Sequence, residues 1–229
     1  MSREMNRREF LKTSAATSTV WVTAGTGFIS PTLTFAAERT PISLLKPQVD
    51  GGRPFMQVLK DRKTSREFSP EKLPLQILSN LLWAAFGVNR SDSGKRTAPS
   101  ANNRQEIDIY VATAEGLYLY DAKSHALMPV LAEDIREKTG RQPFVKDAPV
   151  NLVYVADLAK MGTASQADKD FYSAADTGFI SQNVYLYCAS EGLATFVRAM
   201  VDRPILAKAM NLRPDQKIIL AQSVGYPKK

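Results

Sequence analysis

The segment that most constrains the fold is a long helix predicted over residues 166–191. Side chains on one face recur at spacings of three and four residues, which is the period of an α-helix. They are Phe171, Ala174, Ala175, Gly178, Ser181, Tyr185, Cys188 and Ala189. Several are small, so another helix can approach closely. Gly192 is a natural stop for this helix.

A predominantly apolar run over residues 150–155 predicts a buried central strand. Alternating or apolar stretches predict further strands at 107–111, 116–121, 126–128, 193–197 and 217–224. Helices are predicted at 54–60, 74–86, 129–138 and 203–211. This order of elements predicts an α+β fold, with a sheet flanked by helices.

The N-terminus has the order of parts expected of a twin-arginine export signal. Arg7 and Arg8 precede a Phe-Leu pair and Lys12. A mildly apolar stretch follows over residues 13–35, with Pro31 and too many hydroxyls for a membrane anchor. Small residues at the end of this stretch offer a cleavage site for a signal peptidase. We expect residues 1–36 to be a signal peptide, so the twin-arginine machinery is a partner and the mature protein is periplasmic or otherwise exported. An ordinary basic amphipathic N-terminus is the alternative.

Composition limits the remaining chain to a few classes. Residues 37–52 contain two prolines and two glycines and are predicted to be an extended leader, and 53–229 form one domain. The whole chain has a net charge of +7 but no basic stripe typical of nucleic-acid binding. Cys188 is the one cysteine and His125 the one histidine, which argues against a His/Cys metal site. Each is predicted to be structural: Cys188 as buried packing and His125 as a solvated turn residue.

Two polar segments are candidates for ligand binding. Residues 61–68 gather cations and hydroxyls that a bound anion would stabilise, because arginine suits bidentate contact with phosphate. Residues 96–105 combine small residues with amides that can both donate to and accept from a heterocycle. Taken singly, the first is equally a solvated basic loop and the second a polar loop before a strand.

Together the two segments resemble the FMN-dependent nitroreductase family. The first matches the family at Arg62, Thr64, Arg66 and Phe68, and the second at Pro99, Ser100, Ala101, Asn103 and Gln105. Asp176, residues 181–186, residues 191–194 and the Val-Gly-Tyr-Pro ending at 224–227 also match. The resemblance spans residues 53–229. The hairpin at 116–121 is more similar to the flavin dehydrogenase branch of the family than to the classical nitroaromatic reducers.

The resemblance implies a nitroreductase-like fold with a mostly antiparallel central sheet, a homodimer, and FMN bound across the dimer interface. Arg62, Lys63 and Thr64 would hold the phosphate and ribityl chain, and Arg66 would lie by the pyrimidine edge. Ser100, Ala101 and Asn103 would come from the other subunit. Residues 196–200 would cover the flavin face, with the backbone N–H near Ala199 at the reactive nitrogen. No catalytic side chain or metal is then required, since the flavin carries the chemistry.

Departures from the family pattern lie near the end of the chain. Ala199 and Met200 replace the family's frequent Glu and Gly, which would change substrate access. Many members carry a phosphate-binding cation after the Gly-Tyr-Pro turn, and Lys228 is the candidate here. Arg198 is either a group at the mouth of the site that attracts an anionic substrate, or part of an ion pair at the surface or dimer interface.

The leading functional hypothesis is an exported FMN oxidoreductase that passes electrons to or from a small organic substrate. NAD(P)H is not expected outside the cytoplasm, so a protein or membrane electron carrier, or the substrate itself, would reduce the flavin. A non-catalytic exported binding protein that keeps the fold without the cofactor is the alternative.

Overall fold

The apolar run at 150–155 lies at the centre of the sheet in the computed structural model, which describes residues 40–229. All eight residues of β7 (Val150–Asp157) are buried, and the strand pairs antiparallel with neighbours on both sides. The sheet has seven strands, and every pairing in it is antiparallel. In sheet order they are β1 (Ile42–Ser43), β6 (Ala126–Leu131), β5 (Gly116–Asp121), β4 (Ile107–Thr113), β7, β9 (Gln216–Gly225) and β8 (Ala194–Arg198).

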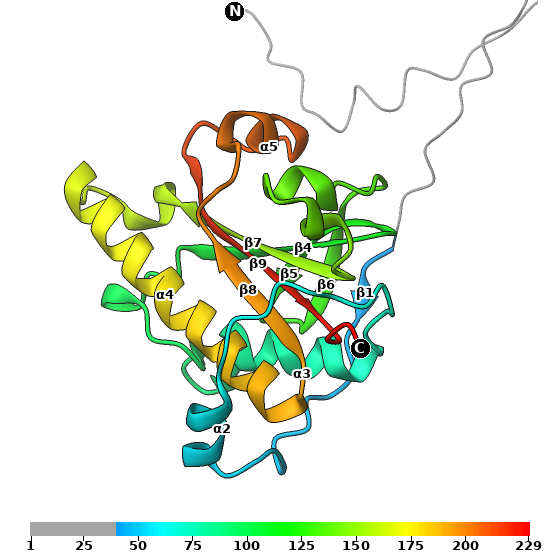
Figure 1. Cartoon of the computed structure of the whole chain (residues 1–229). Coiled ribbons are helices and arrows are strands. Elements are labelled where there is room, and N and C mark those ends of the chain that lie inside the picture. The colour runs from blue at the N-terminus through cyan, green and yellow to red at the C-terminus, as the bar shows by residue number, and fades with distance from the viewer. Residues whose placement is uncertain (1–39) are drawn as a thin grey trace, which may run out of the picture. The chain divides into compact units, whose positions relative to one another are not determined.

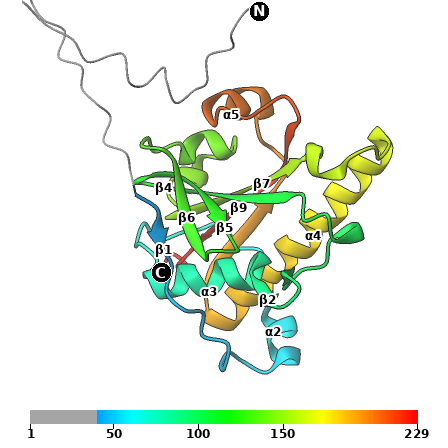
Figure 2. The ribbon, with the colours of Figure 1, turned by 180° about the vertical axis from the view of Figure 1, so that it is seen from behind.

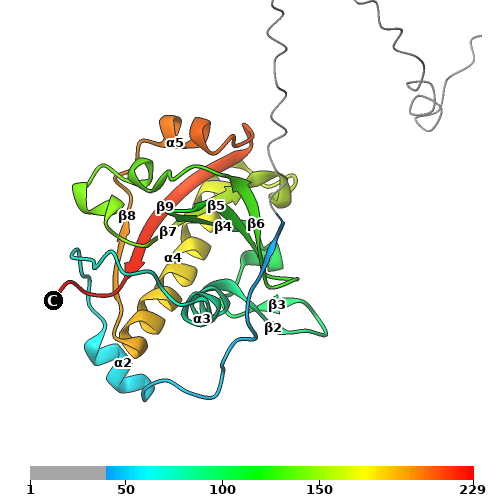
Figure 3. The ribbon, with the colours of Figure 1, turned by 90° about the vertical axis from the view of Figure 1, so that its right-hand side faces the viewer.

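Helices cover both faces of this sheet. Figure 1 shows α3 (Leu75–Phe86) and α4 (Gln166–Glu191) together, with the short α2 (Phe55–Asp61) at one end of α4. Figure 3 shows α5 (Arg203–Ala209) on the opposite side of the strands. A small hairpin of β2 (Val88–Arg90) and β3 (Lys95–Arg96) follows α3. The predicted α+β fold, a mostly antiparallel sheet flanked by helices, is confirmed.

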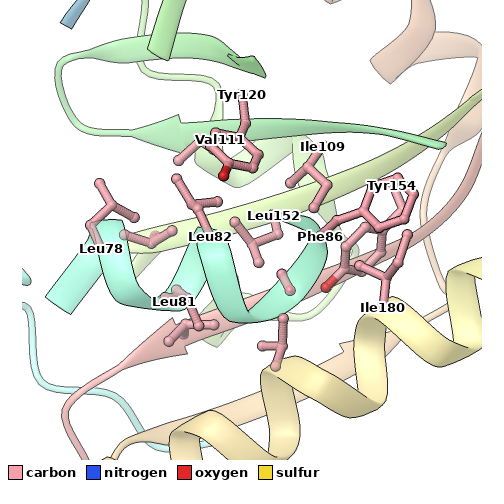
Figure 4. Close-up of a cluster of buried hydrophobic side chains, with 14 of the residues drawn as sticks. Leu78, Leu81, Leu82, Phe86, Ile109, Val111, Tyr120, Leu152, Tyr154 and Ile180 are labelled. Carbon is pink, nitrogen blue, oxygen red and sulfur yellow. The ribbon is translucent and has the colours of Figure 1, made fainter. Parts of the chain in front are cut away.

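Alternation along the strands divides the core into two clusters. Leu152 and Tyr154 of β7 face α3 and α4, whereas Val153 and Val155 face Leu206 of α5. Figure 4 shows Leu78, Leu81, Leu82 and Phe86 of α3 packed against Ile109, Val111, Leu152 and Tyr154 of the sheet and Ile180 of α4. Burial of these side chains stabilises the sheet at roughly 1.5–3 kcal/mol for each large residue.

Helix α4 has the bounds that the sequence predicts. Ser165 caps its first turn by accepting a hydrogen bond from the Asp168 N–H, and Gly192 ends it in the left-handed region at φ 70°. The predicted single face is wrong, however: Phe171, Ala174 and Gly178 are exposed, whereas Ser181, Tyr185 and Cys188 are buried. A stripe spaced at 3.5 residues drifts by about 20° per heptad around a straight helix, so its two halves face different surroundings.

Other sequence predictions were wrong between residues 88 and 138. The predicted helix at 129–138 is absent: β6 continues to Leu131, and only a 3₁₀ turn follows at Arg136–Thr139. The β2–β3 hairpin was not predicted. The leader contributes β1, which lies beside β6 at the edge of the sheet in Figure 2.

The predicted signal peptide, and residues 37–39 of the predicted leader, lie outside the described residues. Among residues 40–229, no helix is both long and apolar enough to cross a membrane.

Candidate functional site

The cationic segment follows α2 and runs between β8 and the C-terminal residues. Arg62 leaves the helix at ψ 118°, and its N–H donates to the Val58 carbonyl. The Ser65 N–H then donates to the Thr195 carbonyl of β8 at 2.9 Å. Further along, the Ser69 N–H donates to the Tyr226 carbonyl at 2.9 Å. Backbone hydrogen bonds therefore hold the segment and leave its charged side chains out of the anchoring.

Aromatic rings orient the two arginines of this segment. The Arg62 guanidinium carbon lies 5.2 Å from the Tyr185 ring centroid, and that of Arg66 lies 4.6 Å from the Phe196 centroid. The Tyr185 hydroxyl accepts from the Val197 N–H at 3.1 Å and lies 3.1 Å from the Thr64 hydroxyl. Arg62, Thr64 and the edge of β8 thus meet at one tyrosine of α4.

A cavity of about 480 Å³ opens beside this tyrosine. Its volume is within the range of roughly 300–1,000 Å³ typical of small-molecule sites. Arg53 forms an ion pair with Asp61, the one carboxylate of the lining. No ion pair is found within residues 40–229 for the other cations of the lining, Lys60, Arg62 and Lys63. The cavity therefore has an excess of positive charge suited to an anion such as phosphate.

A second cavity, of about 740 Å³, adjoins the first and shares Gly192 and Pro227 with it. Lys228 and Lys229 line this second cavity together with Phe68. The Lys228 N–H donates to the Glu67 carbonyl at 3.3 Å, which fixes the backbone there. The predicted phosphate ligand Lys228 therefore lies next to the cationic cavity, on its C-terminal side.

The second predicted segment lies elsewhere in the same chain. The Ala101 N–H donates to Asp176 Oδ2 at 2.9 Å, and the Ser100 hydroxyl donates to Glu106 Oε2 at 3.2 Å. Asp176 precedes Tyr185 by nine residues of α4, or about 13 Å along the helix axis. Within one chain, Ser100 and Ala101 therefore lie apart from Arg62, at a different position along α4.

The backbone of this second loop turns sharply. Asn102, Asn103 and Gln105 have φ values of 54°, 54° and 49°, in the left-handed region that side chains other than glycine seldom adopt. Side-chain hydrogen bonds hold the turn: Gln105 Nε2 donates to Asn103 Oδ1 at 3.1 Å, and Arg96 Nε donates to Gln105 Oε1 at 2.7 Å. The loop therefore has a defined conformation that its own side-chain hydrogen bonds hold in place.

Two buried carboxyl groups anchor the loop, and the sequence analysis did not single out Glu106. Glu106 is 0% exposed and Asp176 is 3% exposed. Burial, together with the neighbouring Asp176, raises the pKa of the Glu106 carboxyl. A proton on Glu106 relieves the repulsion between the two groups. Glu106 immediately precedes the alternating strand β4, where a glutamate normally faces solvent, so no signal in the sequence distinguished it.

These features coincide with a known family. The profile of the Nitroreductase family matches residues 59–226. This chain belongs to the nitroreductase family. A candidate nitroreductase of Methanocaldococcus jannaschii is 33% identical over 65% of this chain and 80% of its own length.

Solved structures of family members have the same fold. The crystal structure of a candidate nitroreductase from Ralstonia eutropha JMP134 superposes with a TM-score of 0.81, at 44% identity over 84% of this chain and 92% of that chain. The NADPH:FMN oxidoreductase of Vibrio harveyi, solved with NAD⁺, has a TM-score of 0.59 at 16% identity, over 76% of this chain and 69% of that chain. The second likeness supports the fold alone.

For this nitroreductase-family member, both expectations for the Arg198 side chain were wrong. It is 3% exposed and points into the interior, where Nη1 donates to the Ser223 hydroxyl at 2.7 Å. Nη2 donates to Asn151 Oδ1 at 3.0 Å and to Thr139 Oγ1 at 2.7 Å. Ala199 follows as an exposed residue, and its carbonyl accepts from the Val201 N–H at 2.9 Å.

The single histidine and cysteine both have packing roles. Cys188 is buried, as predicted, and burial raises the pKa of its thiol. His125 lies in a turn, but the prediction that it is solvated was wrong. Its Nε2 lies 2.7 Å from the Ser79 hydroxyl, and its Nδ1 lies 3.0 Å from the Tyr120 hydroxyl. Burial lowers the pKa of His125, so the ring is neutral at neutral pH.

Proposed function

We propose that this nitroreductase-family oxidoreductase binds FMN in the cationic cavity and works outside the cytoplasm. The observation that supports this most strongly is the set of cations lining the cavity without carboxylate partners, next to Tyr185. An FMN phosphate supplies the missing negative charge. When bound, the flavin supplies the chemistry of electron transfer, so the protein needs no side-chain nucleophile.

Each residue of the first segment has a binding role in this proposal. Arg62 and Lys63 hold the phosphate and the ribityl chain, with the Thr64 hydroxyl as a neutral partner. Arg66, held against Phe196, is directed at the pyrimidine edge, where reduced flavin carries negative charge. Lys228 neutralises the phosphate from the adjoining cavity, and the backbone at Ala199 borders the flavin face.

A homodimer completes the site. Ser100, Ala101 and Asn103 do not line the cationic cavity of their own chain, so we propose that the second copy supplies them. The Ala101 N–H already donates to Asp176 and the Ala101 carbonyl accepts from the Arg104 N–H, which leaves the Ala101 methyl group for contact with the partner's FMN.

The exposed face of α4 supports this assembly. Phe171 is 69% exposed and Phe179 is 48% exposed, and a Cβ added at Gly178 would meet no atom within 4 Å. Two α4 helices packed antiparallel, with the twofold axis midway between Asp176 and Tyr185, would bring the loop of one copy to the cavity of the other.

Export sets the choice of electron donor. The twin arginines support transport of the folded protein with its cofactor loaded, to a compartment where NAD(P)H is not expected. We propose that a protein or membrane electron carrier, or the organic substrate itself, reduces the flavin. The substrate is a small molecule.

Purification of the full chain tests the proposal. We expect a yellow protein with the visible absorption of a flavin, and release of FMN on denaturation. Candidate reductants and acceptors are then screened on the holo-protein. A colourless protein that takes up no added FMN would contradict the proposal and favour a binding protein without cofactor.

A further inference from the structure

Arg198 is a buried cation whose partners are all neutral. Its guanidinium donates to the carbonyl and hydroxyl of Thr139, to the Ser223 hydroxyl and to the Asn151 amide oxygen. Within residues 40–229 no carboxylate forms an ion pair with it. Burial lowers the pKa of Arg198 to about 10, which still leaves the group charged at neutral pH.

The surrounding chain is shaped to hold this side chain. A Cβ at Gly140 would lie 2.4 Å from Arg198 Nε, so a side chain there would displace the guanidinium. Asn151 is itself fixed, because its Nδ2 donates to the Val145 carbonyl at 2.9 Å. A buried charge without a counter-charge is normally avoided in proteins. Its presence in a formed niche indicates a purpose other than stability.

The position of Arg198 indicates which charge it would act on. It shares one face of β8 with Phe196, two residues earlier on the strand. The Arg66 guanidinium carbon lies 4.6 Å from the Phe196 ring centroid, and the same ring packs against Phe144 with centroids 5.4 Å apart. Arg66 therefore contacts the Phe196 ring from an exposed position, and the buried Arg198 lies two residues further along the same face of the strand.

We infer that Arg198 is a positioning residue that favours negative charge on the ligand held at the Arg66–Phe196 end of the site. The inference rests on the proposed function, in which that ligand is the isoalloxazine of FMN. Addition of two electrons and one proton to oxidised FMN gives an anionic reduced flavin. A fixed buried cation, screened little by solvent, stabilises this anion relative to the oxidised form.

Replacement of the charge tests the inference on the full chain loaded with FMN. Arg198→Met removes the charge and keeps much of the volume. We expect the preference of the protein for reduced over oxidised FMN to fall about tenfold, which is a midpoint potential about 30 mV lower for a two-electron couple. Affinity for oxidised FMN should change less than threefold. Arg198→Lys should retain a potential close to wild type.

A second variant leaves the arginine in place and supplies a counter-charge. Asn151→Asp converts the amide oxygen that accepts from Arg198 into a carboxylate, so the potential should fall in the same direction. The control is Arg213→Met, because Arg213 already pairs with both Asp157 and Asp215 and its loss should leave the potential unchanged.

The outcomes separate the inference from the proposed function. Wild-type potentials in both Arg198→Met and Asn151→Asp would overturn the inference while leaving FMN binding intact. A wild-type protein that binds no FMN would overturn the proposed function and the inference with it. A lowered potential in both variants, with Arg213→Met unchanged, would support the role of the Arg198 charge.

Discussion

Two loops lie against the same helix, α4, and use their polar groups in opposite ways. At Tyr185, the 62–68 loop is held by backbone bonds and aromatic contacts, and its cations form no ion pair among the described residues. At Asp176, the 100–105 loop is held by two buried carboxyl groups that accept its own N–H and O–H donors.

This difference separates groups available to a ligand from groups that shape the loop. The cations of the first loop can bind an anion without breaking any contact within the fold. The carboxyl groups that hold the second loop are already engaged, because they accept from Ser100 and Ala101 in a loop with three left-handed residues. Charge alone therefore does not mark a binding group, and the partner of each charge must be known.

Removal of the free cations should have the largest effect. Arg62→Ala with Arg66→Ala is expected to weaken FMN binding by about a hundredfold or more, since charged hydrogen bonds contribute ~1.5–3 kcal/mol each. Binding is measured by fluorescence titration. Lys123→Ala with Lys208→Ala removes two exposed charges elsewhere as the control. Unchanged FMN retention in the Arg62/Arg66 double variant would mean that the phosphate site is elsewhere.

A bulky residue on α4 tests whether the two loops meet across copies. Gly178→Arg meets open space within the monomer, so the fold should persist, while the dimer should weaken about tenfold or more through overpacking. The molar mass measured by light scattering and the amount of FMN retained should fall together. Ile205→Arg on α5, across the sheet from α4, is the control. A dimer that survives Gly178→Arg with FMN bound would contradict the proposed α4 interface.

Neutralisation of Glu106 in the carboxyl pair should produce a moderate change in thermal stability that depends on pH. Because the pKa of Glu106 is raised in the fold, its stabilising effect is full below the ordinary value of 4.5 and is lost as pH rises through the raised value. Glu106→Gln should therefore raise the melting temperature at pH 8 by about 2–4 °C relative to wild type, and by less at pH 4.5. A constant difference across this range would show that the proton on Glu106 does not matter.

Replacement of His125 should have the smallest effect on thermal stability, and its dependence on pH should be opposite to that of Glu106. Its pKa is lowered in the fold, so its stabilising effect is full above the ordinary value of 6.5 and is lost as pH falls. His125→Gln should reduce the loss of melting temperature between pH 8 and pH 5 by on the order of 1 °C. Thermal melts at the two pH values measure it; an unchanged loss would mean that His125 does not titrate in this range.

Sequence patterns were sufficient to predict an element or a binding residue where several local signals agreed. The bounds of α4 followed from a periodic run that ends at a glycine stop, and β7 followed from a run in which five of six residues are apolar. Both arginines of the first loop were identified because they belong to the cluster of cations and hydroxyls at 61–68 that resembles the family, a signal contained within eight adjacent residues.

The sequence predictions failed where tertiary contacts determine the local structure. Pro129 suggested a helix start, yet it lies in β6. This is tolerated because β1 pairs only with Ala126 and Leu127, so no ladder bond is lost at the outer side of Pro129. Burial of Arg198 could not be predicted, since arginine is normally exposed and its partners Thr139, Asn151 and Ser223 are distant in sequence.

Short backbone pairings at the two ends of the sheet have a consequence for handling the protein. The leader strand β1 lies along β6, and the Ser65 N–H occupies a carbonyl of β8 at the opposite edge. Uncovered strand edges recruit other chains and cause aggregation. A truncation that begins after Ser43, or a change that displaces the 62–68 loop, should therefore reduce the yield of soluble protein before it alters any chemistry.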